Sequence, residues 1–431
     1  MPDRSDAPLD SRVPFRGARP SAGGEAQATG GRWLGIDSEQ PGRTLVVQAD
    51  LTADRVEDCL RTLTALTRAL GAAGARPGFA RVAAGAPVVA PTVLVGFSAR
   101  LFGGPWTVLR DDEEHSARWG HRVRRPSSLR MMDAKRDDEY PAFRTESQYI
   151  AHETDLVLVA EADRQDQLDT VQEVLREVEA AGGLAVRAVH RGGLLAGGRD
   201  PFGFEDGTSN LQYLREHDPE RYADLVLDRD LYGGGGGDSA GSYLVFRRYR
   251  TFPERLTAAE PLELPASRGV PARSLTPVEV VGRCPASGLV VDALTRRPLP
   301  AEPDERQGAR AIPQSHVRQA NPRGQGTTNF GHAVRVPDAR ILRRSYPYVG
   351  EGPDGTECGL LFMAYQAEIQ HSGFEFIHNE WLMSQFNGAP DPLLAPESGL
   401  VEPLTGCYYY VPRDQPQLDE VLGELLAQEE T

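Results

Sequence analysis

The segment Thr44-Leu-Val-Val-Gln-Ala-Asp50 is a short apolar run of the kind that forms a buried strand. Thr52 follows it, at a position where a side-chain hydroxyl can cap the start of a helix. Beyond it, Val56 and four leucines recur at helical spacing as far as Gly71, and a glycine commonly ends a helix. These residues therefore predict a strand followed by an amphipathic helix.

The same plan continues along the first half of the chain. Three further apolar runs predict strands over residues 91–97, 155–161 and 184–189. Between the last two, apolar residues recur at helical spacing after Asp163, which is expected to cap that helix. The order strand–helix–strand–strand–helix–strand is that of the ferredoxin-like fold, in which both helices lie on one face of an antiparallel sheet.

The second half repeats this plan loosely. Thr276-Pro277 has the residue types that open a helix, and the other periodic segments predict strands and one helix over residues 242–248, 341–348, 359–365, 374–382 and 408–411. We therefore predict the α+β class, with two ferredoxin-like domains and antiparallel sheets. The domains cover residues 31–198 and 199–431, and residues 1–30 are expected to form a disordered N-terminal arm.

Composition excludes several function classes. The chain has 431 residues and a net charge of −15 with no densely basic block, so nucleic acid is not an expected partner. No apolar run reaches the roughly 18 residues of a membrane span, and the first 30 residues lack the apolar core of a secretion signal. The four cysteines lie far apart without a CxxC pair, which is typical of a reducing compartment. We therefore expect a cytoplasmic protein that contacts no membrane.

A long insertion over residues 283–338 is expected to build the functional site, because insertions of this length are uncommon in compact domains. It contains His316, followed closely by Arg318 and Arg323. A lone histidine is more often a solvated residue than a ligand, but guanidinium groups beside it suit a cofactor that carries carboxylates. No second ligand stands at zinc spacing, so His316 fits one axial ligand of a macrocycle better than a tetrahedral metal site.

Two other segments have residue types that suit a site. In Gly203-Phe-Glu-Asp-Gly207, the flanking glycines would let Asp206 approach a ligand closely, although a pair of turns explains the same residues. Arg343 and Arg344 lie in a β-patterned segment, so their side chains point to opposite faces. One of them would be buried, and a buried arginine requires an anion. The alternative is an edge strand with both arginines in solvent.

In this order along the chain, the segments around Asp206, His316 and Arg343, followed by Gly359-Leu-Leu-Phe362 and Tyr365-Gln366, resemble the dye-decolorising (DyP-type) peroxidase family over about residues 40–415. The resemblance implies one haem b per chain, bound in the C-terminal half, with His316 as the proximal ligand of the iron. It further implies that Asp206 and, of the two arginines, Arg343 lie on the distal side. The remaining matches are Arg323, expected at a haem propionate, and Leu360 and Phe362, expected over the distal pocket.

The implied function is that of a haem peroxidase that uses hydrogen peroxide to oxidise a bulky organic or dye-like one-electron donor. Asp206 would move a proton between the peroxide oxygens, and Arg343 would stabilise the charge on the departing oxygen. Since an arginine lowers the pKa of a neighbouring carboxyl, activity should persist into acid. On the proximal side an acid should accept the other ring N–H of His316, and Glu368 is the candidate.

Two other interpretations stay open. A protein that stores haem or removes its iron would need His316 but neither Asp206 nor Arg343. A ferredoxin-like scaffold or binding module without catalysis would use all three residues structurally. The resemblance also makes a homo-oligomer an expectation, although no apolar stripe in the sequence identifies its interface.

Overall fold

The structure is a computed structural model. It describes residues 32–33, 35–52, 56–78, 81–82, 89–98, 154–205, 211–227, 241–257, 260–267, 269–299, 310–322, 327–329, 332–334, 339–352, 355–367, 369, 372–383 and 388–412. The expected N-terminal arm over residues 1–30 lies outside the described residues.

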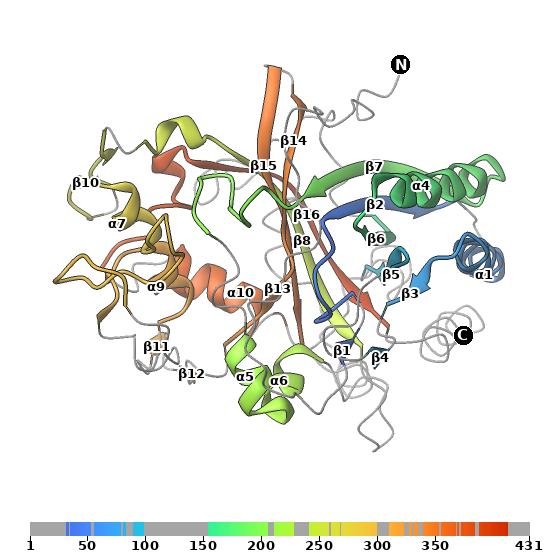
Figure 1. The fold of residues 1–431 in the computed structure, drawn as a ribbon, viewed down its shortest axis with the longest axis horizontal. Helices are drawn as coiled ribbons and strands as arrows, with labels where there is room; N and C mark the ends of the chain where they lie inside the picture. The colour runs from blue at the N-terminus through green and yellow to red at the C-terminus, as the bar shows by residue number, and fades with distance from the viewer. Residues whose placement is uncertain are drawn as a thin grey trace.

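The first half has the expected strand–helix–strand–strand–helix–strand order (Figure 1). In the strand over Arg43–Leu51, Leu45, Val47 and Ala49 alternate with Val46, so the two sets face two different clusters of buried residues. The elements of this half are β1 (Arg32–Trp33), β2 (Arg43–Leu51), α1 (Val56–Ala72), β3 (Arg76–Pro77), β4 (Arg81–Val82), β5 (Thr92–Phe97), β6 (Leu156–Ala162), α4 (Gln165–Ala180) and β7 (Leu184–Gly193).

The second half repeats the order with long excursions between its strands. Its helices are α5 (Gln212–His217), α6 (Pro219–Val226), η4 (Pro253–Arg255), α7 (Pro277–Val281), α9 (His316–Ala320), α10 (Phe374–Phe376), η7 (Ile377–Leu382) and η8 (Pro396–Ser398). Its strands are β8 (Ser242–Thr251), β9 (Leu262–Leu264), β10 (Arg273–Leu275), β11 (Thr327–Asn329), β12 (His332–Val334), β13 (Leu342–Arg343), β14 (Tyr346–Gly352), β15 (Gly355–Gln366) and β16 (Val401–Val411).

The main strands of the two halves have the same order across the sheet. In the first half the order is β7-β2-β6-β5, and in the second it is β16-β8-β15, with β13 and β14 both paired to β15. Both orders are those of two interlocked strand–helix–strand units, as in the ferredoxin-like fold. The edge strands β16 and β5 pair through Tyr410 and Phe97, so one sheet continues from one half into the other. The predicted fold class is therefore confirmed.

Helices cover the outer face of the sheet. The inner face is curved, so that strands from its two halves contact each other across it. Helices α1 and α4 cover the outer face of the first half, whereas α7, α9 and α10 lie on the other side of the molecule (Figure 1). On the inner face, β7 returns against β14: a Cβ added at Gly192 would lie 2.8 Å from the Cβ of Tyr346. The tight approach of these two strands encloses a second core, which both halves build.

Two expected details differ. Asp163 does not cap α4, because Arg164 stands between them and the Asp163 carboxylate accepts the N–H of Gly42 at 2.9 Å. The helix expected over residues 374–382 is a single turn, α10, followed by the π-helical turn η7. Turns of this kind are frequent beside functional sites.

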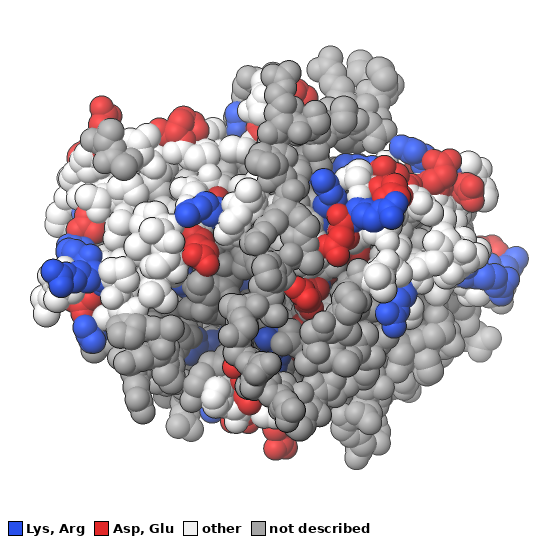
Figure 2. Space-filling model, in the orientation of Figure 1, with Lys and Arg blue, Asp and Glu red and all other residues white. Residues whose placement is uncertain are grey.

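The described part of the surface carries mixed charge. On the face drawn in Figure 2, acidic and basic side chains are interspersed over the described residues, without a continuous basic stripe. None of the described helices is long and apolar enough to cross a bilayer.

Candidate functional site

His316 is the first residue of α9, inside the long insertion of the second half. The helix begins close to the end of α7, where Gly282 has a positive φ of 86° and lies so close to Ser315 that a Cβ there would collide with the Ser315 side chain. The backbone N–H groups of Arg318 and Gln319 both donate to the carbonyl of Ser315, which closes the first turn. His316 is thus held at the start of a short helix, with 23% of its side chain exposed.

Asp391 is the acid that contacts His316. Its Oδ2 lies 2.8 Å from His316 Nδ1, and the side chain is fully buried. Its other oxygen accepts the backbone N–H groups of Leu393 at 2.8 Å and Leu394 at 3.1 Å. Because a carboxylate only accepts hydrogen bonds, Nδ1 carries a proton, and in the neutral imidazole Nε2 then keeps its lone pair. This is the tautomer that binds a metal through Nε2.

Arg318 lies two residues after His316 and is a buried cation. It is 3% exposed, and its Nη1 has no hydrogen-bond partner among the described residues. Burial lowers the pKa of Arg318. A buried guanidinium is costly without an anion, so a ligand carboxylate would satisfy it. The donor set of His316 and Arg318 therefore fits a metal-bearing group with carboxylate arms, and haem is such a group.

Arg343, Leu360 and Phe362 share the outer face of the sheet in the second half. Arg343 pairs with Ala364 on β15, and residues 360, 362 and 364 alternate with the inner-face residues Leu361 and Met363. All three side chains are half-buried, whereas their inner-face neighbours are fully buried. The sheet thus presents an arginine and two apolar side chains on one incompletely covered face.

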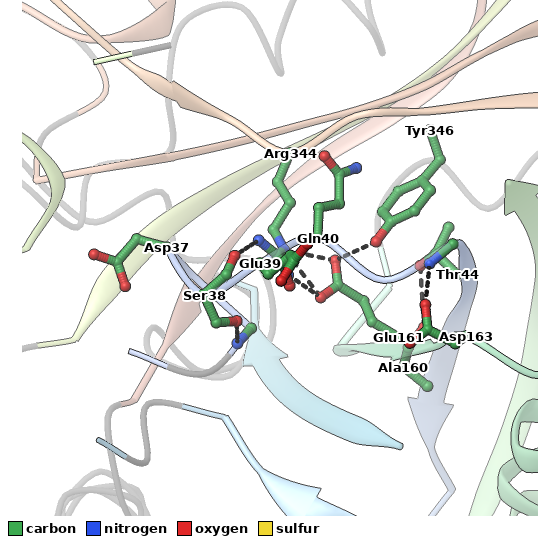
Figure 3. A network of polar contacts seen from close by, with 12 residues as sticks. Asp37, Ser38, Glu39, Gln40, Thr44, Ala160, Glu161, Asp163, Arg344 and Tyr346 are labelled. Atoms are coloured by element: carbon green, nitrogen blue, oxygen red, sulfur yellow. Dashed lines mark hydrogen bonds and ion pairs between the residues drawn. The ribbon is translucent and has the colours of Figure 1, made fainter. Parts of the chain in front are cut away.

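Arg344, the neighbour of Arg343, points to the inner face. It is 4% exposed and forms a two-pronged ion pair with Glu161 of β6, with Nε at 2.7 Å from Oε1 and Nη2 at 2.7 Å from Oε2 (Figure 3). The expected alternation of the two arginines is therefore confirmed, and the buried one has the anion it requires. Of the two, only Arg343 faces the same side as Leu360 and Phe362.

One apolar cluster connects the helix of His316 with the strand of Arg343. Trp381 and Leu382 of η7, with Ala339 and Ile377, form its buried centre. Ala320 at the end of α9 and Ile341, two residues before Arg343, both pack against this centre. The structure therefore brings the proximal candidate and the face of the distal candidate to one end of the second half.

A basic and aromatic stack covers part of this face. The ring of Phe374 contacts Phe362 with centroids 5.6 Å apart and stacks on His378 at 5.3 Å. The guanidinium of Arg247 lies 4.5 Å from the centre of the same Phe374 ring. Burial, and then the charge of Arg247, lower the pKa of His378 well below its usual value. His378 is therefore a neutral core residue at neutral pH.

Three expected site residues, Asp206, Arg323 and Glu368, lie outside the described residues. Asp391 is a described residue of the candidate site that was not expected from the sequence. Its local sequence, Asp391-Pro392, is typical of a turn, and nothing in it indicates a partner 75 positions earlier. The sequence also gives no indication that Glu161 pairs with Arg344, because the two residues are 183 positions apart.

Comparisons with known proteins agree on one family. The family model described as "Dyp-type peroxidase, C-terminal" matches residues 198–415. Among solved structures, a DyP-type peroxidase from Cellulomonas bogoriensis is 23% identical with a TM-score of 0.55, and the match covers 88% of this chain and 91% of that one. A DyP-type peroxidase from Anabaena sp. is 18% identical with a TM-score of 0.57, covering 89% and 91%.

A third solved structure, ferric DtpA from Streptomyces lividans, is 17% identical with a TM-score of 0.56, and the match covers 93% of this chain and 100% of that one. At these identities the structural likeness establishes the fold. No curated protein matches the chain.

Proposed function

Because the chain belongs to the Dyp-type peroxidase family, we propose that it is a haem b enzyme that uses hydrogen peroxide to oxidise bulky, dye-like organic one-electron donors. The observation that carries this proposal is the hydrogen bond of 2.8 Å between His316 Nδ1 and Asp391 Oδ2. It leaves Nε2 of His316 as the lone pair available to the iron, and it makes the imidazole a stronger donor.

The described residues supply binding groups for both parts of haem b. His316 would bind the iron, and Arg318 would hold a propionate together with Arg323, which lies outside the described residues. Leu360 and Phe362 would pack against the ring of the bound group. When bound, haem b would supply a redox-active iron at which peroxide can react.

The chain's own contribution to peroxide cleavage is proton movement and charge stabilisation. A carboxylate oxygen of Asp206 would accept the proton of one peroxide oxygen and return it to the other; such a positioned base contributes about 10²–10⁴-fold. The guanidinium of Arg343 would stabilise the negative charge that develops on the departing oxygen. Arg344 is excluded from this role in the proposal, since its three nitrogens are occupied on the inner face.

The cytoplasm is the proposed location, and a homo-oligomer the proposed assembly. None of the four cysteines is in a disulfide, which supports a reducing compartment. The assembly rests on the family resemblance alone, and analytical ultracentrifugation at several protein concentrations would decide it.

The test combines haem reconstitution with peroxide. Wild-type protein should develop a Soret band with haem b, and one equivalent of hydrogen peroxide should change that band. His316→Ala should lose the ligated spectrum, because no other described side chain at the start of α9 can take its place. Arg343→Leu should keep the haem but lower kcat/KM for peroxide by about 10²–10³-fold, as for the removal of one preorganised charge-stabilising donor.

His217→Ala and Arg187→Leu are the matched controls, because both side chains are exposed, on α5 and β7, and neither belongs to the proposed site residues. Both should retain haem and turnover. A wild-type protein that binds haem but gives no spectral change with peroxide would favour haem storage or iron removal instead. Absence of any Soret band would leave only the scaffold interpretation.

A further inference from the structure

Gln319 lies three residues after His316 on α9, and its side chain is fully buried. Its amide nitrogen Nε2 donates to the carbonyl oxygen of Ala389 at 3.1 Å and to that of Gln314 at 3.4 Å. Ala389 stands two residues before Asp391 and 70 positions after Gln319. The amide therefore connects the helix that begins with His316 to the segment that carries the acid beside it.

The surroundings of the Gln319 amide decide its orientation. A carbonyl oxygen only accepts hydrogen bonds, so only the NH2 end of the amide can face two of them. The other end, Oε1, is then buried without a hydrogen-bond partner among the described residues. A buried polar atom without a partner is costly, and an apolar side chain of the same size would avoid this cost. The two bonds of the NH2 group are therefore what distinguishes glutamine from an apolar residue at this position.

The segment around Asp391 is held between η7 and α9. On the side of η7, the N–H of Asp391 donates to the carbonyl of Leu382 at 2.8 Å. On the side of α9, the carbonyl of Ala389 accepts from Gln319. Ala389 is itself fully buried, so water does not compete for this bond, and a hydrogen bond in such surroundings is stronger than one in solvent. Loss of the Gln319 amide would leave the approach of this segment to α9 less well defined.

We propose that Gln319 is a positioning residue for the pair of His316 and Asp391. By tying α9 to Ala389, it keeps Asp391 Oδ2 at the observed 2.8 Å from His316 Nδ1. A shift of about 1 Å between the two segments would lengthen this contact beyond the range of a hydrogen bond. Nδ1 would then no longer be the preferred position of the imidazole proton. The inference rests on the proposed function only in that the lone pair left on Nε2 binds the haem iron.

The haem-free protein tests the inference through the tautomer of His316. NMR of protein with isotope-labelled histidine distinguishes a neutral imidazole with its proton on Nδ1 from one with its proton on Nε2, and His316→Ala identifies the signals. The wild-type protein should hold the Nδ1–H form. In Gln319→Met, which keeps the size of the side chain but has no donor, the ratio of Nδ1–H to Nε2–H should fall by about 2–10-fold. This is the factor that corresponds to the net contribution of one hydrogen bond.

Gln48→Met is the matched control. Gln48 is also a fully buried glutamine, and its Nε2 donates to the hydroxyl of Tyr409 at 2.9 Å, but it lies on β2 in the inner core. Its loss should lower the free energy of unfolding and leave the tautomers of His316 unchanged. If Gln319→Met does not fold, Gln319→Asn gives the same measurement, because its amide is one methylene short of the two carbonyls.

Titration with haem separates positioning from a general loss of stability. Gln319→Met should weaken haem binding by about 2–10-fold, the same factor as for the tautomers. In an Asp391→Asn background the same substitution should cause no further loss, because the acid that Gln319 positions is already gone. Gln48→Met should leave the affinity for haem unchanged in both backgrounds.

Three results would overturn the inference. The first is a wild-type protein with the His316 proton on Nε2, and the second is a wild-type tautomer ratio in Gln319→Met. The third is a loss of haem affinity from Gln319→Met that is as large in the Asp391→Asn background as in the wild type, which would indicate a merely structural residue. If the wild-type protein does not bind haem at all, the proposed function fails, and the tautomers measured without haem still decide whether Gln319 positions the pair.

Discussion

Asp391 and Asp292 are two buried acids of the second half that make the same local turn. Each accepts the backbone N–H groups two and three residues later, Leu393 and Leu394 in one case and Leu294 and Thr295 in the other. They differ in their long-range partner: Asp391 contacts His316, whereas Asp292 pairs with Arg310 at 2.8 Å. Substitutions at the two aspartates therefore distinguish the effect of weakening this turn from the effect of losing the acid beside His316.

Asp391→Asn is predicted to weaken haem binding by about 10–100-fold, the usual cost of removing the acid behind a metal-bound histidine. The amide has no charge with which to hold the Nδ1–H tautomer of His316, so Nε2 becomes a weaker and less well oriented donor. Titration of the protein with haem, followed at the Soret band, measures the change.

Asp292→Asn is the control for that experiment. It should lower the free energy of unfolding, because the same turn and an ion pair are weakened, but leave the affinity for haem unchanged. Equal loss of affinity in the two variants would show that the turn, and not the contact with His316, matters.

At the scale of elements, α9 is only one turn long, so its position depends on what it packs against. An isolated helix of this length is unstable in water. Gly282, at the end of α7, lets the two helices approach until only a hydrogen atom fits between the backbone and Ser315. Ala320 at the other end packs against the cluster of Trp381 and Leu382.

Gly282→Ala is therefore predicted to displace the start of α9 and to lower both stability and haem affinity. The substitution forces an L-residue into a positive φ, at a cost of about 1–2 kcal/mol, and pushes the new methyl group into Ser315. Unfolding by denaturant gives the first effect, and titration with haem gives the second.

Gly269→Ala isolates the first of these effects. Gly269 has nearly the same φ, 82°, but apart from its chain neighbours no atom of the described residues lies within 4 Å of an added Cβ. This variant should lose stability through backbone strain and keep its haem affinity. If Gly282→Ala also keeps its haem affinity, the placement of His316 does not depend on this contact.

For the whole molecule, two buried histidines link stability to pH. His190 lies in the inner core, where its Nε2 contacts Gln48 at 3.1 Å, and His378 lies under the candidate site. Burial first, and then the charges of Arg248 and Arg247 respectively, lower the pKa of each well below its usual value. Both side chains therefore stay neutral in the folded protein under conditions in which the unfolded chain takes up protons.

The free energy of unfolding is predicted to fall as the pH drops below about 6.5, the pKa of histidine in an unfolded chain. Below that value the unfolded state binds more protons than the folded state, so each histidine costs up to about 1.4 kcal/mol per pH unit while it stays neutral in the fold. Above about pH 6.5 the two histidines are neutral in the unfolded chain as well, so their burial no longer lowers the free energy of unfolding. Denaturant unfolding at a series of pH values between 5 and 8 measures the slope.

His190→Gln should reduce that slope, because one of the two buried imidazoles is gone while a hydrogen-bonding side chain remains. His217→Asn, at an exposed position on α5, is the control and should keep the wild-type slope. An unchanged slope in His190→Gln would mean that His190 takes up its proton in the folded state as well.

Several elements could be predicted from sequence because their causes are local. The strand after Arg43 and the helix that begins at Val56 follow from the spacing of apolar residues, and the start of α7 follows from Thr276, whose hydroxyl accepts the N–H of Glu279. The capping role expected of Asp163 was wrong, because the nearby Gly42 N–H competed for its carboxylate. Periodicity also predicted opposite faces for Arg343 and Arg344, but not which arginine faced inward.

The sequence by itself determined the plan of two ferredoxin-like halves, because the repeat of apolar residues follows the period of the element that buries them. It also singled out His316 and the pair Arg343 and Arg344. Only the tertiary structure decided that Asp391 is the acid beside His316 and that Glu161 pairs with Arg344. These are contacts between residues far apart in the chain, and their geometry exists only after the sheet has closed and the helices have packed.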